Sequence, residues 1–348
     1  MNPSLKAFKG EYQTLLLDFL WRQWSALGVA GQTRAEDDWI IDPEALLLLT
    51  CTVGRYDPRL FDEMLDWLQA NGWLINVMRL KRILRTEKFA GEPVLAAIAG
   101  LLAKGTEAPK WKQLAASVAR PAASEALFFH QDGEPIPAIG ESELLFARYG
   151  WLRGPLRLRG YSQEFRPTDV ANLVLQLRAL FGISVRCEIV IYLLTHDAAH
   201  PSQIARDACY FERAVQGTLV DMSRSGVIQV RAASREKHYW LKQEQWMQLL
   251  NRNEQSAPKW VTWPPLFSAL EQIWLRLNDP KLHNLESLLQ ASEVRQLMTK
   301  VRPSLERSGL DRTLSDDRQH LGESYLPVFI ADVKKLLVSI AAPRGPTL

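Results

Sequence analysis

The chain has few cysteines, and the three that it has are not arranged for a disulfide framework or a metal site. Cys51, Cys187 and Cys209 are scattered along 348 residues, and no CxxC pair occurs. Small disulfide-stapled folds and structural zinc sites need cysteines in pairs or clusters. The sequence therefore predicts free thiols, no bound metal and a reducing compartment.

Long apolar runs are lacking as well. Residues 46–49 form a run of leucines that is short, whereas a membrane-spanning helix needs about 18 or more mostly apolar residues in succession. The first residues, MNPSLKAFKGEYQ, contain no apolar core of the kind found in secretory signal peptides. We therefore expect a soluble cytoplasmic protein that makes no membrane contact.

The chain has little excess charge of either sign. It contains 42 lysines and arginines against 39 acidic residues, a formal net charge of +3. Affinity for nucleic acid would therefore have to come from local basic patches. The length of 348 residues, a hydrophobic content of 47% and 12 tryptophans allow two or three domains with sizeable cores.

Motifs of common catalytic sites are missing. The sequence contains no P-loop, no GxGxxG, no GxSxG and no HExxH. His196 and His200 have the spacing of helical metal ligands, but they bracket a turn and have no third ligand nearby, so a turn and a helix cap are expected. Cys209 is expected to be a small buried hydrophobe, with a redox-sensing thiol as the alternative. We expect neither an enzyme nor a bound cofactor.

Residues 184–242 show an ordered succession of patterns. Apolar spacing and the start signal of Pro201 indicate successive helices, and Gly226 is the expected left-handed stop of the last one. Alternating residues then predict a β-hairpin with a polar tip. The expected elements are helices over residues 185–195, 201–208 and 211–225, followed by strands over 227–230 and 238–241.

The third of these helices has two unlike faces. Val215, Thr218, Leu219 and Met222 lie on one side and are expected in the core. The opposite side carries Arg213, Gln216, Gly217, Val220 and Arg224. A helix of this size fits the major groove of DNA, where base edges present distinguishable donors and acceptors. The glycine permits close approach, and the valine suits a thymine methyl group.

Two neighbouring segments suit the DNA backbone. Ser202 and Arg206 lie on the second helix. The hairpin segment 229–242 carries four basic residues and one acidic residue, which suits phosphates or the minor groove. The expected contacts of the hairpin are Arg231, Arg235, Lys237 and His238.

This stretch resembles the winged helix-turn-helix domain of bacterial regulators of the ArsR and MarR type. The resemblance rests on PSQIARDA, AVQGTLVDMSRSGVI and REKHYWL, and it covers about 60 of 348 residues. It implies a transcriptional regulator that binds specific double-stranded DNA, and two-fold operators would imply a homodimer. The alternative is a protein-interaction adaptor, or a partner subunit of a toxin or defence system, that uses the winged helix as a docking module.

The whole chain is expected to be mainly α-helical with small β wings and to have several domains. The expected domains are a helical N-terminal domain over 1–140, a basic segment with the winged helix-turn-helix over 141–250, and a helical C-terminal region over 251–348. Residues 40–90 fit either a second, degenerate winged helix, with a short extended run at 73–75, or a plain helical domain. The basic residues Arg79 and Arg82 in this region suit either phosphate contact or a solvated helix face.

The most basic stretch of the chain is residues 148–166. It holds five arginines against one glutamate and interleaves them with aromatic residues. Arginines beside aromatic side chains suit contact with nucleic acid, including RNA. The alternation at residues 156–159 also fits an ordinary edge strand with its arginines in water, so both interpretations stay open.

Overall fold

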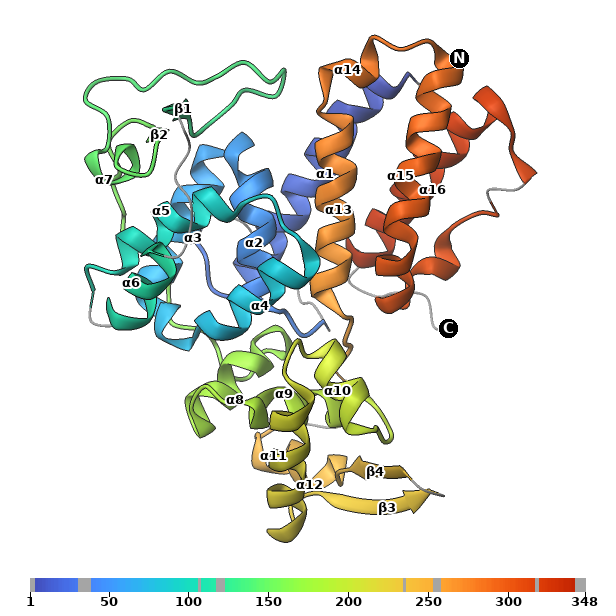
Figure 1. The fold of residues 1–348 in the computed structure, drawn as a ribbon. Helices are drawn as coiled ribbons and strands as arrows, with labels where there is room; N and C mark the ends of the chain where they lie inside the picture. Colours follow the sequence, from blue (N-terminus) through green and yellow to red (C-terminus); the bar gives the residue numbers. More distant parts are fainter. Residues whose placement is uncertain are drawn as a thin grey trace.

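The computed structural model describes residues 4–30, 39–105, 108–116, 123–233, 236–252, 258–316 and 319–341. Helices form most of these residues, and the strands belong to two small two-stranded sheets. Figure 1 shows a broad helical body and, below it, a narrower projection that carries one of the two sheets. The expected mainly α-helical class with small β elements is confirmed.

The first part of the body is a set of helices, and local sequence signals mark where two of them begin. Asp42 and Asp57 cap two of them, accepting hydrogen bonds from the backbone N–H groups of Ala45 and Leu60, and a proline follows each cap. The helices are α1 (Leu5–Ala26), α2 (Pro43–Val53), α3 (Pro58–Asn71), α4 (Val77–Glu87), α5 (Glu92–Leu102) and α6 (Ala108–Ala116).

The extended run expected at residues 73–75 is wrong, and the edge strand left open as an alternative at residues 156–159 does not occur. Gly72–Leu74 forms the 3-10 helix η2, so Trp73 continues a helical turn. No strand occurs within residues 39–105, all of which the structure describes, so the segment 40–90 contains helices without a hairpin. Residues 156–159 are irregular too, although β1 (Glu125–Ala126) and β2 (Trp151–Leu152) pair nearby as a short parallel sheet.

The projection contains the succession of elements expected from residues 184–242. Gly226, with φ +79°, separates its last long helix from an antiparallel hairpin. The elements are the 3-10 helix η3 (Val170–Asn172), α8 (Leu173–Phe181), α9 (Val185–Thr195), α10 (Pro201–Asp207), α11 (Glu212–Arg224), β3 (Gln229–Ala233), β4 (Glu236–Trp240) and α12 (Gln243–Leu249).

The C-terminal helices return to the body rather than extending the projection. Helix α1 packs against α13 and α16, and α2 packs against α13, so both ends of the chain share one hydrophobic core. A second core cluster lies in the projection. The division at residues 140 and 250 stays a prediction. The C-terminal helices are α13 (Trp263–Leu277), α14 (Pro280–His283), α15 (Ser287–Arg307) and α16 (Tyr325–Ala341).

No helix among the described residues combines the length and the apolar character that a membrane crossing requires. The longest, α1 and α15, have 22 and 21 residues, and both carry charged side chains along their length.

Candidate nucleic-acid interface

Helix α11 lies in the projection with one face in its core and the other in solvent. Val215, Leu219 and Met222 are buried and recur at steps of four and three, the spacing that places side chains on one face of a helix. Thr218, expected in the core, is only half-buried. The apolar stripe therefore fixes how α11 is rotated about its axis.

The opposite face of α11 is open. Arg213, Gln216, Gly217 and Arg224 are exposed, and Val220 is half-buried. A Cβ atom placed on Gly217 would meet no described atom within 4 Å, so nothing packs over this part of the helix. Arg224 approaches Asp221 at 3.8 Å, but both side chains remain largely exposed. The structure thus brings the predicted contacts of this helix together on one accessible face.

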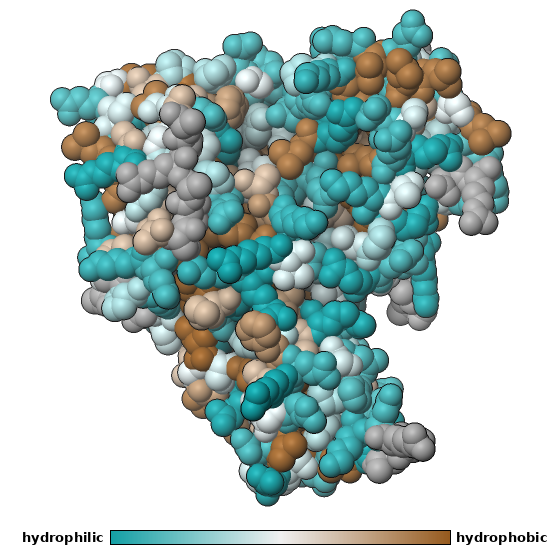
Figure 2. All heavy atoms as spheres, in the orientation of Figure 1, coloured by the Kyte–Doolittle hydropathy of each residue, from teal (hydrophilic) through white to brown (hydrophobic). Residues whose placement is uncertain are grey.

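The hairpin is bonded to the loop that precedes α10. Ala199 and Tyr239 exchange two backbone hydrogen bonds of 3.0 and 2.9 Å, so β4 is fixed to that loop. Arg231 and Lys237 are exposed, and His238 lies 3.6 Å from Glu236. Arg235 lies outside the described residues. On the face shown in Figure 2, hydrophilic side chains cover most of the lower end of the molecule, where Figure 1 places α11 and the hairpin.

Helix α10 begins at Pro201, as expected from the sequence, and the structure adds a capping box before it. His200 accepts from the N–H of Ser202, and the Gln203 side chain accepts from the N–H of His200. His196 stacks on Tyr192 with ring centroids 4.0 Å apart. Both histidines therefore take part in the turn and the helix cap that were expected at this position.

The two residues of α10 predicted to contact the DNA backbone lie in a cleft of about 290 Å³. Arg206 is exposed but forms an ion pair of 2.7 Å with Asp207, and Ser202 is half-buried. The body supplies two further arginines to this cleft, Arg82 from α4 and Arg307 from α15. Sequence reasoning did not connect Arg307 with this surface, because no local pattern indicates that α15 meets α10.

The turn between α10 and α11 is docked on α4. The Asn76 amide donates to the Tyr210 hydroxyl at 2.5 Å, and the Arg79 Nε donates to the Ala208 carbonyl at 2.9 Å. The Arg82 guanidinium lies 3.9 Å from the centroid of the Phe211 ring, a cation–π contact. Arg79 is buried, so the phosphate contact considered for it is wrong. These contacts anchor the N-terminal end of α11 to the body.

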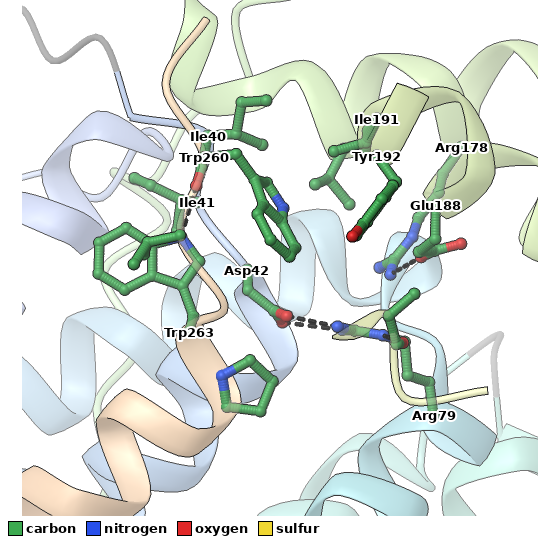
Figure 3. Close-up of a pocket in the computed structure, with 14 residues that line it drawn as sticks. Ile40, Ile41, Asp42, Arg79, Arg178, Glu188, Ile191, Tyr192, Trp260 and Trp263 are labelled. Carbon is green, nitrogen blue, oxygen red and sulfur yellow. Dashed lines mark hydrogen bonds and ion pairs between the residues drawn. The ribbon is translucent and has the colours of Figure 1, made fainter. Parts of the chain in front are cut away.

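A buried charge network joins the projection to the body. Glu44 of α2 accepts from Arg79 at 2.7 Å and from Arg178 of α8 at 2.5 and 2.9 Å. Arg178 also contacts Glu188 of α9 at 2.6 Å, and Arg79 contacts Asp42 (Figure 3). Two arginines and three carboxylates are thus paired with almost no exposure to solvent. The helices α2, α4, α8 and α9 contribute to this network.

The pKa shifts in this network follow from its pairings. Burial by itself would raise the pKa of Asp42, but the charge and hydrogen bonds of Arg79 outweigh that effect and lower it. Burial likewise opposes the charge of Arg178, yet Glu44 and Glu188 raise the pKa of its guanidinium. The lowered pKa of Asp42 and the raised pKa of Arg178 both favour the charged form, so each of these two charges depends on its partners.

The cavity next to this network is too small for a ligand. Its volume is about 30 Å³, and Tyr192, Trp260 and Trp263 form part of its wall (Figure 3). Small-molecule sites commonly have volumes of about 300–1,000 Å³. The network is therefore a structural junction that fixes the projection on the body.

The basic stretch 148–166 is turned toward the body. Arg153 is buried and forms a double hydrogen bond with Asp62 of α3 at 2.6 and 2.8 Å. Asp66 of the same helix accepts from the N–H groups of Gly160 and Ser162. Arg157 and Arg159 line a cleft together with acidic side chains of α3. Much of the positive charge of this stretch therefore faces the protein's own carboxylates.

The thiol next to α11 is unsuited to redox sensing. Cys209 is buried, and this burial raises the pKa of its thiol to about 12. A reactive cysteine needs a lowered pKa and solvent access. The buried small hydrophobe expected from the sequence agrees with this environment, and φ of +58° shows that the residue also forms the turn.

Comparison with models of protein families gave no match, and neither did comparison with curated proteins or with solved structures. Function has to be inferred from the residues of the site and their surroundings.

Proposed function

We propose that this chain binds specific double-stranded DNA as a transcriptional regulator, through a winged helix-turn-helix formed by α9–α11 and the β3–β4 hairpin. The observation that carries the proposal is the open face of α11, where Arg213, Gln216 and Arg224 stand opposite the buried stripe. Arginine pairs with guanine and glutamine with adenine through two hydrogen bonds each in the major groove.

The neighbouring elements suit the DNA backbone. The exposed Arg231 and Lys237 of the hairpin provide positive charge beside α11, and Arg206 does so from α10. Such contacts set register and affinity, whereas base contacts set specificity. A homodimer would place two α11 helices on half-sites one turn of DNA apart, about 34 Å.

The test is fluorescence anisotropy of the purified chain with DNA from upstream of its own gene and with a scrambled duplex, each at two salt concentrations. Wild type is expected to prefer the first duplex, and its affinity should fall as salt rises. Reversing two charges, Arg213→Glu and Arg224→Glu, should weaken specific binding by about 100-fold or more, since each base contact contributes about 1–3 kcal/mol.

The matched control is Lys281→Glu with Lys300→Glu, two exposed positions on α14 and α15 in the body. This variant changes the net charge equally and should lose much less affinity. Equal losses of DNA affinity in both variants, or an unchanged affinity in the α11 variant, would show that α11 is not the helix that contacts the bases.

Protein docking through the same helix is the second candidate, and the charge balance of α11 favours it. Glu212 and Asp221 offset its two arginines, and Phe211 at its start is 70% exposed. An adaptor would bind both duplexes weakly and equally, or not at all. Its partner would then be sought by pull-down with the wild-type chain and the α11 variant.

A further inference from the structure

A second surface of the projection has the properties of a small-molecule site. A cleft of about 540 Å³ lies between α8, α9, α12 and the C-terminal end of α11. This volume falls within the range of about 300–1,000 Å³ that is typical of ligand pockets. It is far larger than the 30 Å³ cavity beside the charge network.

The walls of the cleft are mainly apolar. Val190, Met222 and Trp246 form buried parts of the wall, whereas Phe181, Val227 and Leu249 are 39%, 47% and 61% exposed. Phe181 and Trp246 meet edge to face, with ring centroids 6.1 Å apart. An apolar occupant would remove these exposed side chains from water, which favours binding in proportion to the apolar area that is buried.

One charged side chain lines this cleft. Arg186, in the first turn of α9, is exposed there, and no aspartate or glutamate is among the described lining residues. No hydrogen-bond or ion-pair partner of its guanidinium occurs among the residues that the structure describes. The other arginines discussed above in α4, α8 and α10 all pair with carboxylates or stack on a ring. Arg186 therefore remains available to an anion.

We propose that this cleft binds an amphipathic carboxylate, such as a medium-chain fatty acid, with the alkyl chain between Phe181 and Leu249 and the carboxylate on Arg186. An arginine binds a carboxylate through two parallel hydrogen bonds, which fixes the orientation of the ligand. A purely apolar ligand would leave the guanidinium unused, and a small polar anion would leave the apolar walls exposed.

The cleft is connected to the DNA-binding elements through the chain itself. Met222, Ser225 and Gly226 at its edge end α11, and Val227 leads into β3. An occupant would contact the end of α11 opposite to the end that is anchored on α4. The consequence, a change in DNA affinity on ligand binding, rests on the proposed function, whereas ligand binding itself does not.

The test is isothermal titration calorimetry of the full chain with octanoate and with 1-octanol, a neutral analogue of similar length. Wild type should bind octanoate at one saturable site. Arg186→Gln should weaken octanoate binding by about 10-fold or more and leave 1-octanol binding unchanged. Val227→Trp should weaken both ligands, because the larger side chain fills the cleft. Arg85→Gln, which replaces an exposed arginine of α4 in the body, should change neither.

Three results would overturn the proposal: no saturable octanoate binding by wild type, equal effects of Arg186→Gln on both ligands, or no effect on either. Sedimentation velocity adds a fourth. If wild type is a dimer and Leu249→Arg makes it monomeric, a second copy of the chain covers the cleft in place of a small ligand. None of these readouts involves DNA, so failure here is distinguishable from failure of the proposed function.

Discussion

The carboxyl group of Glu271, in the body, is almost completely buried. It lies on α13 and is 1% exposed. The Thr52 hydroxyl donates to one of its oxygens at 2.5 Å, and the Ala90 N–H donates to the other at 2.9 Å. Burial nevertheless dominates and raises the pKa of Glu271 to about 7, because the hydrogen bonds that the carboxylate accepts only partly offset its loss of hydration.

This raised pKa predicts how stability depends on pH. The carboxyl has a pKa of 4.5 in the unfolded chain and about 7 in the folded one. The stability that its protonation contributes is fully present below pH 4.5 and is lost as pH rises to about 7. The loss should be on the order of 3 kcal/mol in the free energy of unfolding. Urea denaturation at several pH values between 4.5 and 8 measures it.

The variant Glu271→Gln separates this group from the others that titrate. The substitution should reduce the decrease in the free energy of unfolding between pH 5 and 7. At pH 8, the variant should unfold at a higher urea concentration than wild type. The exposed Glu306 provides the control, and Glu306→Gln should change stability by less than about 0.5 kcal/mol. A Glu271→Gln curve that falls as steeply as wild type would show that other groups cause the pH dependence.

At the scale of single elements, α11 can be tested for its orientation apart from its function. Leu219 is 0% exposed in the core of the projection, and Gln216, almost one turn earlier, is exposed. Leu219→Ala should lower the free energy of unfolding by about 2–5 kcal/mol, because it removes buried methyl groups and leaves a cavity. Gln216→Ala should leave stability within about 0.5 kcal/mol of wild type.

Chemical denaturation followed by circular dichroism compares the two variants. Similar losses for both would mean that α11 is rotated differently from the structure. In that case, the open face assigned to Arg213 and Arg224 would have to be assigned again. Loss of DNA binding in Gln216→Ala without loss of stability would support the proposed function, since that side chain has no role in the core.

At the scale of the whole molecule, the buried charge network holds the two hydrophobic cores in a fixed relation. Arg178 is fully buried and joins Glu44 of the body to Glu188 of the projection. Arg178→Met should destabilise the fold by about 3–5 kcal/mol, because it leaves buried carboxylates without their partner. Thermal and urea denaturation should show the loss, with the projection unfolding before the body.

A partly exposed ion pair provides the comparison. Arg276 pairs with Asp279 and Glu293 at 2.6 Å, with about a quarter of its own side chain exposed. Arg276→Met should cost about 1 kcal/mol or less, since partly solvated pairs contribute little. If both variants lost the same stability, the network would be no more than a set of ordinary surface pairs.

Local chemistry allowed much of the fold to be predicted. The Asp-Pro starts of α2 and α3, the left-handed stop at Gly226 and the apolar stripe of α11 depend on neighbours within a few residues. The same holds for the order of three helices and a hairpin in the projection. Backbone hydrogen bonding and side-chain periodicity are local properties, so the sequence reveals them.

The sequence by itself thus determined where most helices lie and which face of α11 is open. Only the tertiary structure decided which charged side chains pair, because the partners are distant in the sequence. Arg178 pairs with Glu44 across 134 residues, and Arg153 pairs with Asp62 across 91. The sequence of residues 148–166 left contact with nucleic acid and an ordinary edge strand both open, and only the fold shows that α3 places carboxylates beside this stretch. A buried charge needs an opposite charge close to it in space, and the separation of the two residues in the sequence does not indicate which residues will meet.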